Sequence, residues 1–194
     1  MLDLNSNANK EVKVENIEKV REFMVTFGQQ TEYNYVPAEV AALRRSLIEE
    51  ELGELEEAVD VKNIVEVADA LADLEYVILG AMIVFGQVPF LPTFKTLEVL
   101  KIDGLIMSEG LDEMLDYLDL IDFSSTLIDQ LSCVRYMANK FGVPLQHCFD
   151  EVHRSNMSKL GEDGKPIYRE DGKVLKGPGY FKPDIAKVLR DHGV

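Results

Sequence analysis

The residues best suited to chemistry form a dense run of acidic side chains in the first half of the chain. Eleven aspartates and glutamates fall within residues 46–75, with a single lysine among them. A solvated helix face usually mixes both signs of charge, because like charges four residues apart destabilise a helix. Spacings of three or four place two subsets on common helix faces: Glu50 with Glu54, and Glu66 with Asp69 and Asp73.

Folding this segment back on itself brings the two subsets together. A turn at residues 60–63 would place Glu54 and Asp69 at equal heights, each roughly 9 Å from the turn, and would bring Glu50 level with Asp73. Carboxylates that converge cannot all ionise at their usual pKa unless a cation lies between them. All-oxygen ligands suit Mg²⁺ or Mn²⁺. A solvated acidic surface is the alternative, although the alanines around Asp69 favour burial.

Helices are the elements that must position these acids. Apolar residues recur at spacings of three and four along most of the chain. The pattern predicts an all-α fold, a bundle of four or more helices, after a frayed lead-in over residues 1–14. The expected helices cover residues 14–27, 37–60, 64–85, 111–141 with a break near Ser124, and 146–159.

The C-terminal part of the sequence has a different character. Residues 161–184 contain five glycines and three prolines, and two short β-prone runs flank an Asp-Gly pair. An Asp-Gly pair between such runs is typical of a β-hairpin. We therefore expect a helical domain over residues 1–160 and a basic tail with a short β-hairpin over 161–194, both parts of one domain.

Composition excludes several classes of function. A net charge of −15 argues against binding a nucleic-acid polymer or an anionic membrane surface. The longest apolar run, residues 76–86, is too short to span a bilayer, and no export signal is visible at the N-terminus. The two cysteines are too few for a disulfide framework, so we expect free thiols and a cytoplasmic protein.

Two strings resemble a known superfamily. RRSLIEEELGELEEA followed by EVADALAD is similar to the EExxE…ExxD signature of the all-α nucleoside triphosphate pyrophosphohydrolases, which include the MazG-like proteins, the dimeric dUTPases and the phosphoribosyl-ATP pyrophosphohydrolases. EVHRSNMSKL and the segment DGKPIYREDGKVLKGPGYFKPD resemble the C-terminal part of the phosphoribosyl-ATP pyrophosphohydrolase-like, often phage-encoded, branch. Together the strings cover nearly half of the chain.

The resemblance implies Mg²⁺-dependent hydrolysis of a nucleoside triphosphate, such as a dNTP or a modified nucleotide, to the monophosphate and pyrophosphate. It implies that Glu50, Glu54, Glu66 and Asp69 coordinate metal and that Glu51 orients or deprotonates the attacking water. The geometry of the helical hairpin adds Asp73, which the family pattern does not require. Members of this superfamily are usually oligomers, so a homodimer or homotetramer is expected.

Residues near the C-terminus are candidates for holding the substrate. Residues 153–194 carry nine basic against six acidic side chains. A triphosphate bound to metal on one side still needs cations on the other. The substrate-binding candidates are Arg154, Asn156, Lys159, Lys165 and Tyr168.

Two other classes of function remain open from the sequence. A carboxylate-bridged metal bundle of the oxidase or ferritin type needs two Glu-x-x-His pairs, and the chain offers one imperfect pair, Asp150 with His153. A non-catalytic acidic interaction protein is the second alternative, and it would have no activity for carboxylate substitutions to remove.

Overall fold

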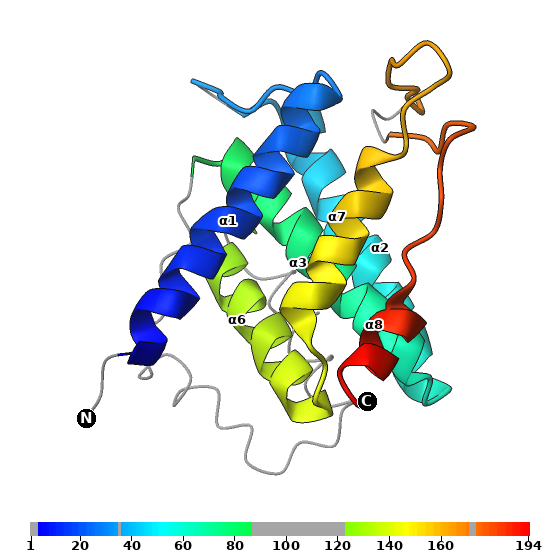
Figure 1. Ribbon diagram of the computed structural model, residues 1–194. Helices are drawn as coiled ribbons and strands as arrows, with labels where there is room; N and C mark the ends of the chain where they lie inside the picture. The colour runs from blue at the N-terminus through cyan, green and yellow to red at the C-terminus, as the bar shows by residue number, and fades with distance from the viewer. Residues whose placement is uncertain (1–3, 35, 87–122, 171–173) are drawn as a thin grey trace.

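The structure, a computed structural model, describes residues 4–34, 36–86, 123–170 and 174–194, all of whose regular elements are helices (Figure 1). This confirms the all-α prediction. The helices are α1 (Leu4–Thr26), α2 (Ala38–Asp60), α3 (Ile64–Val84), α6 (Phe123–Phe141), α7 (Leu145–Met157) and α8 (Ile185–Asp191).

Helix α3 forms the centre of the bundle and contacts each of the other five helices (Figure 1). Almost every side chain from Val67 to Val84 is buried, so this helix is apolar around most of its circumference. Ala68, Ala72 and Gly80 are among them, and small side chains let neighbouring helices approach closely. The centre of the fold is therefore the same helix that carries Asp69 and Asp73.

The turn between α2 and α3 is short, and two of its residues fix its conformation. Lys62 takes a left-handed conformation with φ of 57°, and the side chain of Asn63 accepts hydrogen bonds from the backbone N–H groups of Val65 and Glu66. This cap satisfies donors that the first turn of a helix otherwise leaves unpaired. The predicted helical hairpin is confirmed, with the turn where the sequence places it.

A buried polar cluster links four helices beside the core. The Glu75 carboxylate, only 2% exposed, accepts hydrogen bonds from Arg135 Nη2 at 2.5 Å and from Asn16 Nδ2 at 3.3 Å. Asn16 is also hydrogen-bonded to Gln146. A buried carboxylate is tolerated when it is paired and hydrogen-bonded, so these contacts fix α1, α6 and α7 against α3.

Two sequence predictions need correction. The first helix begins at Leu4 instead of residue 14, because apolar periodicity reports which residues are buried and a helix can extend beyond them. The predicted β-hairpin is not supported: the described part of the tail has one isolated antiparallel bridge, Tyr168 with Val174, and no strand. The predicted helical segment at 111–122 lies outside the described residues.

The tail runs back along α7 and ends in the unpredicted helix α8 (Figure 1). Ser155 Oγ donates to the carbonyl of Phe181 at 2.8 Å, and the Gly177 N–H donates to the carbonyl of Lys159 at 3.1 Å. A Cβ on Gly177 would lie 2.1 Å from the Leu160 carbonyl oxygen, so only glycine fits there. These hydrogen bonds to α7 and to Lys159 take the place of the strand-to-strand hydrogen bonds of a β-hairpin.

Among the helices that the structure describes, none is both long and apolar enough to cross a membrane.

The cap on α3 predicts a stability effect. Asn63→Ala should lower the free energy of unfolding by about 1 kcal/mol, because two backbone donors lose their acceptor. Asn63→Asp keeps an acceptor oxygen and should change stability far less. Urea unfolding of both variants measures the difference, and equal stability of the alanine variant and the wild type would contradict the role of this cap.

Candidate functional site

The carboxyl group of Asp69 has a strongly perturbed pKa. Burial raises its pKa, and the negative charges of Asp73, Glu66 and Glu54 raise it further, to about 7. Its Oδ1 atom is buried and has no hydrogen-bond partner in the described part of the chain. A polar atom in this state normally has an ordered partner, so the site is short of a proton donor or a cation.

The two acidic subsets approach each other across the hairpin. Glu54 comes from α2, whereas Glu66, Asp69 and Asp73 come from α3, and all four interact electrostatically. Their convergence follows from the close packing of α2 on α3. Glu50, one turn before Glu54, is exposed, and its role as a ligand stays a prediction.

The donor set suits a hard divalent cation. It consists of carboxylate oxygens, and one of them is buried and unpartnered. As the described side chains stand, no group of three or more acidic, histidine or cysteine residues is arranged to hold a metal ion. The chemistry of the donors and the unpartnered oxygen are compatible with a divalent cation, and the predicted metal site stays a prediction.

Lys182 is a cation at this site that the sequence did not single out. Its positive charge lowers the pKa of Asp69 and so opposes the effect of the neighbouring acids. The residue lies next to Phe181, whose backbone is hydrogen-bonded to α7. No local spacing relates Lys182 to Asp69, so only the tertiary fold reveals the pair.

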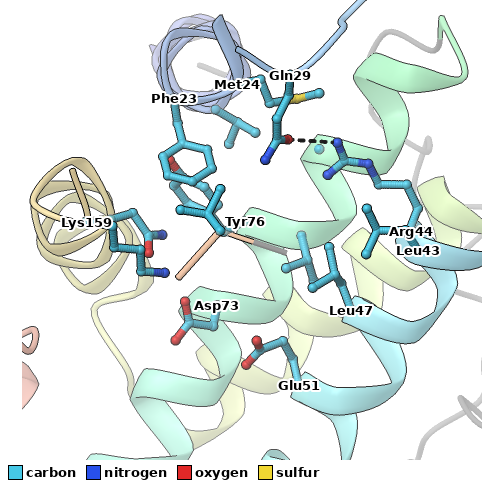
Figure 2. A pocket seen from close by; sticks show the side chains of 15 residues that line it. Phe23, Met24, Gln29, Leu43, Arg44, Leu47, Glu51, Asp73, Tyr76 and Lys159 are labelled. Carbon is cyan, nitrogen blue, oxygen red and sulfur yellow. Dashed lines mark hydrogen bonds between the residues drawn. The ribbon is translucent and has the colours of Figure 1, made fainter. Parts of the chain in front are cut away.

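A pocket continues from the acidic cluster between α1, α2, α3 and α7 (Figure 2). The carboxylates of Glu51 and Asp73 lie at one end, and Arg44 and Gln29 lie at the other. The full lining is Val20, Phe23, Met24, Gln29, Leu43, Arg44, Leu47, Glu51, Asp73, Tyr76, Val77, Gly80, Asn156, Lys159 and Val174.

Tyr76 forms part of the wall of this pocket (Figure 2). Its hydroxyl is 3.0 Å from His153 Nδ1 and also forms a hydrogen bond with Asn156. Burial and the nearby charge of Asp73 raise the pKa of the phenol. The ring meets Phe23 edge-on, with centroids 5.7 Å apart, so the wall is aromatic and rigidly held.

The five substrate-binding candidates fall into two groups. Asn156 and Lys159 line the pocket, and their role in substrate binding stays a prediction. Tyr168 does not line it, but its hydroxyl lies close to Gly28, and its bridge partner Val174 is part of the lining. Lys165 is exposed away from the pocket lining.

Arg154 also lies outside the pocket lining. Both ends of its guanidinium donate to Glu151, at 2.8 and 2.5 Å, and the group stacks over the Phe181 ring at 4.2 Å. It therefore holds the tail against α7 instead of facing the pocket. Its predicted role in substrate binding has no geometric support in this arrangement.

The pair of residues that suggested an oxidase-type metal centre is already engaged. His153 contacts the Tyr76 hydroxyl through Nδ1 and Glu22 through Nε2, the latter at 3.6 Å. Asp150 accepts hydrogen bonds from Lys19 at 2.9 Å and from Gln146 at 3.0 Å. These contacts assign the pair to helix packing, and nothing in the described residues favours a di-iron site.

The sequence motif contains Arg44, but sequence analysis assigned no role to Arg44, Gln29 or Tyr76. Arg44 had a detectable signal, because it lies four residues from both Val40 and Ile48 and therefore on the apolar face of α2. Tyr76 sits within an apolar run and reads as an ordinary core residue. Gln29 lies in a polar loop, where no pattern distinguishes it.

Comparisons with known proteins agree with the motif. The model of the family described as phosphoribosyl-ATP pyrophosphohydrolase matches residues 20–100. An uncharacterized protein of Acanthamoeba polyphaga mimivirus is 31% identical over 184 aligned residues, covering 76% of this chain and 72% of the viral protein. No solved structure gives a significant match.

The raised pKa of Asp69 predicts how stability depends on pH without divalent cations. Between about pH 4 and 7 the unfolded chain releases this proton while the folded chain keeps it, so ionisation disfavours folding as pH rises. Asp69→Asn should therefore gain stability relative to the wild type across this range, by at most about 1.4 kcal/mol per pH unit. Urea unfolding in EDTA at several pH values measures it, with Glu56→Gln as control. A stability difference that does not vary with pH would contradict the prediction.

Proposed function

Since the chain belongs to the phosphoribosyl-ATP pyrophosphohydrolase family, within the all-α MazG-like superfamily, we propose that it hydrolyses a nucleoside triphosphate to the monophosphate and pyrophosphate with Mg²⁺. The family assignment supports a pyrophosphohydrolase-type enzyme, and the substrate and the metal are the proposed part. The observation that carries the proposal is the buried, unpartnered oxygen of Asp69 among three other carboxylates.

The acidic residues would hold the metal. Asp69, with Glu54, Glu66 and Asp73, supplies oxygen ligands, and Glu50 completes the proposed set from the preceding turn of α2. Mn²⁺ has similar ligand preferences and is expected to substitute. When bound, such a cation neutralises charge on the phosphate oxygens and polarises the phosphoanhydride.

Glu51 is the proposed base of the reaction. It is half-buried on α2, lines the pocket and faces Asp73. From this position its carboxylate would orient a water molecule for attack on phosphorus and accept a proton from it. Lys159 enters the pocket from beyond the end of α7 and would neutralise phosphate charge opposite the acids.

The aromatic part of the pocket would hold the nucleoside. The enclosed volume is about 100 Å³, whereas sites for drug-sized ligands typically span ~300 Å³ or more. Only one end of a nucleotide therefore fits inside, and the remainder must extend onto the acidic surface. Phe23, Met24 and Tyr76 offer an apolar, aromatic surface for that buried end.

We expect the working unit to be a homodimer or homotetramer, on the basis of the family alone. Light scattering of the purified protein measures this.

Turnover should depend on the clustered acids. Glu54→Gln and Asp69→Asn should each lower kcat at least 100-fold in an assay of pyrophosphate release from a panel of NTPs and dNTPs with Mg²⁺, because each removes charge from the proposed metal site. Glu50→Gln should abolish turnover if this residue is a ligand.

Glu56→Gln provides the matched control, since Glu56 is exposed on the same helix and outside the cluster. It makes the same charge change and should keep wild-type activity. Pyrophosphate release that is unchanged in both the Glu54 and the Asp69 variants would remove the proposed site.

Divalent cation should stabilise the folded protein even without substrate. A ligand that binds only the native state at 100 times its dissociation constant adds about 2.7 kcal/mol of stability. The melting temperature should therefore rise by several degrees with millimolar Mg²⁺, and Asp69→Asn should reduce that rise. An identical rise in the wild type and in the variant would show that the cation binds elsewhere.

A further inference from the structure

We propose that Arg44 and Gln29 select nucleotides by the base, favouring bases that carry a carbonyl group, namely 6-oxopurines and 4-oxopyrimidines, over the corresponding amino bases. This inference rests on the proposed function, because it assumes that a nucleotide occupies the pocket. The inference adds a base specificity that neither the motif nor the acidic cluster predicts.

The guanidinium of Arg44 is an unusual group to bury here. The residue is 7% exposed, and none of the described residues forms a salt bridge with it. Its Nη2 donates to Gln29 Oε1 at 3.0 Å, while its buried Nε has no hydrogen-bond partner among the described residues. Burial lowers the pKa of Arg44 to about 10, so the group remains charged at neutral pH. A buried cation without a counter-charge is costly unless a ligand supplies acceptors.

Hydrogen-bonding rules fix the orientation of Gln29. A guanidinium has donors only, so the amide oxygen of Gln29 must face Arg44. Its NH₂ group then points away from Arg44 and into the pocket, as Figure 2 shows. This end of the pocket therefore presents donors from both side chains, and its occupant must present acceptors.

The position of these donors suits a base better than a phosphate. Figure 2 shows Met24 beside Gln29 and Leu47 between Arg44 and Glu51, and Phe23 and Tyr76 line another side of the pocket. A flat aromatic ring fits against such side chains, whereas the phosphates belong beside the carboxylates and Lys159. A guanidinium donates well to the O6 and N7 acceptors of an oxopurine. The 6-amino group of adenine is itself a donor, so it cannot accept a hydrogen bond from the guanidinium.

Matched nucleotide pairs test the proposal with the wild-type protein. dITP and dATP differ at the 6-position, and dUTP and dCTP differ at the 4-position, by carbonyl against amino. We expect kcat/KM for pyrophosphate release to favour dITP over dATP by about tenfold or more, the discrimination that a good bidentate contact supplies, and to favour dUTP over dCTP in the same direction through O4 alone. Equal values within both pairs would overturn the proposal and leave the proposed function standing.

Gln29→Glu tests the direction of the hydrogen bonds. The substitution keeps the acceptor for Arg44 but replaces the NH₂ donor with an acceptor oxygen. The dITP/dATP and dUTP/dCTP ratios should fall at least tenfold. Gln30→Glu, with the same charge change on an exposed neighbour, should keep the wild-type ratios. Unchanged ratios in Gln29→Glu would count against the proposal.

Arg44→Lys distinguishes base recognition from phosphate recognition. It keeps the positive charge but removes the planar fork, and a melting curve reports whether the variant folds. A decrease in kcat/KM that is confined to dITP and dUTP supports base recognition. An equal decrease for all four nucleotides would assign Arg44 to the phosphates and overturn the proposal.

Binding of nucleoside monophosphates separates this inference from the proposed function. If no triphosphate is hydrolysed, the proposed function fails. Calorimetric titration with dIMP and dAMP then still measures base preference, and tighter binding of dIMP supports the inference. Equal affinity, or no binding of either, overturns it.

Discussion

The close packing of α2 on α3 places a carboxylate where its charge is disfavoured, and the rest of the site depends on this. Asp69 lies next to alanines in α3, and partial burial of its carboxyl group raises its pKa. The negative charges of acids from both helices raise it further, toward neutrality. A helix pair with bulky residues at these positions would separate the acids and leave the pKa of Asp69 closer to its ordinary value. The packing therefore creates a carboxylate whose charged form a bound cation would stabilise.

The same packing gives one pocket a negatively charged end and a positively charged end. Asp73 and Glu51 give the end near the hairpin turn a negative character, whereas Arg44, two helical turns earlier on α2, gives the other end a positive one. Tyr76 lines the pocket as well and is held by hydrogen bonds to α7. A nucleotide has matching asymmetry, because its phosphates need cations and its base offers neutral acceptors. Arg44, Glu51 and Asp73 lie on helices that are anchored to the core, which favours a preformed site.

Local spacing accounts for what the sequence could predict. The Glu54 and Asp69 faces, the turn at Asn63 and the start of α2 after Pro37 all depend on residues close in the chain. The contact of Lys182 with the acidic cluster and of Asn156 with Tyr76 depends on how α7 and the tail dock, which no periodicity encodes. The prediction of a β-hairpin was wrong for a related reason. Its β-prone residues and Asp-Gly pair are compatible with strands, but hydrogen bonds from the tail to α7 determine the path instead.

The position of the tail connects these points. The carbonyl of Lys159 and the side chains of Ser155 and Ser158 hold the backbone of residues 177–181 against the C-terminal part of α7. That attachment brings Lys182 near Asp69, and Val174, earlier in the tail, reaches the pocket lining. Lys159 both lines the pocket and provides a backbone acceptor for the tail. A change that loosened the tail would therefore remove a cation from the acids and a wall from the pocket together, so the tail belongs to the site as much as the hairpin does.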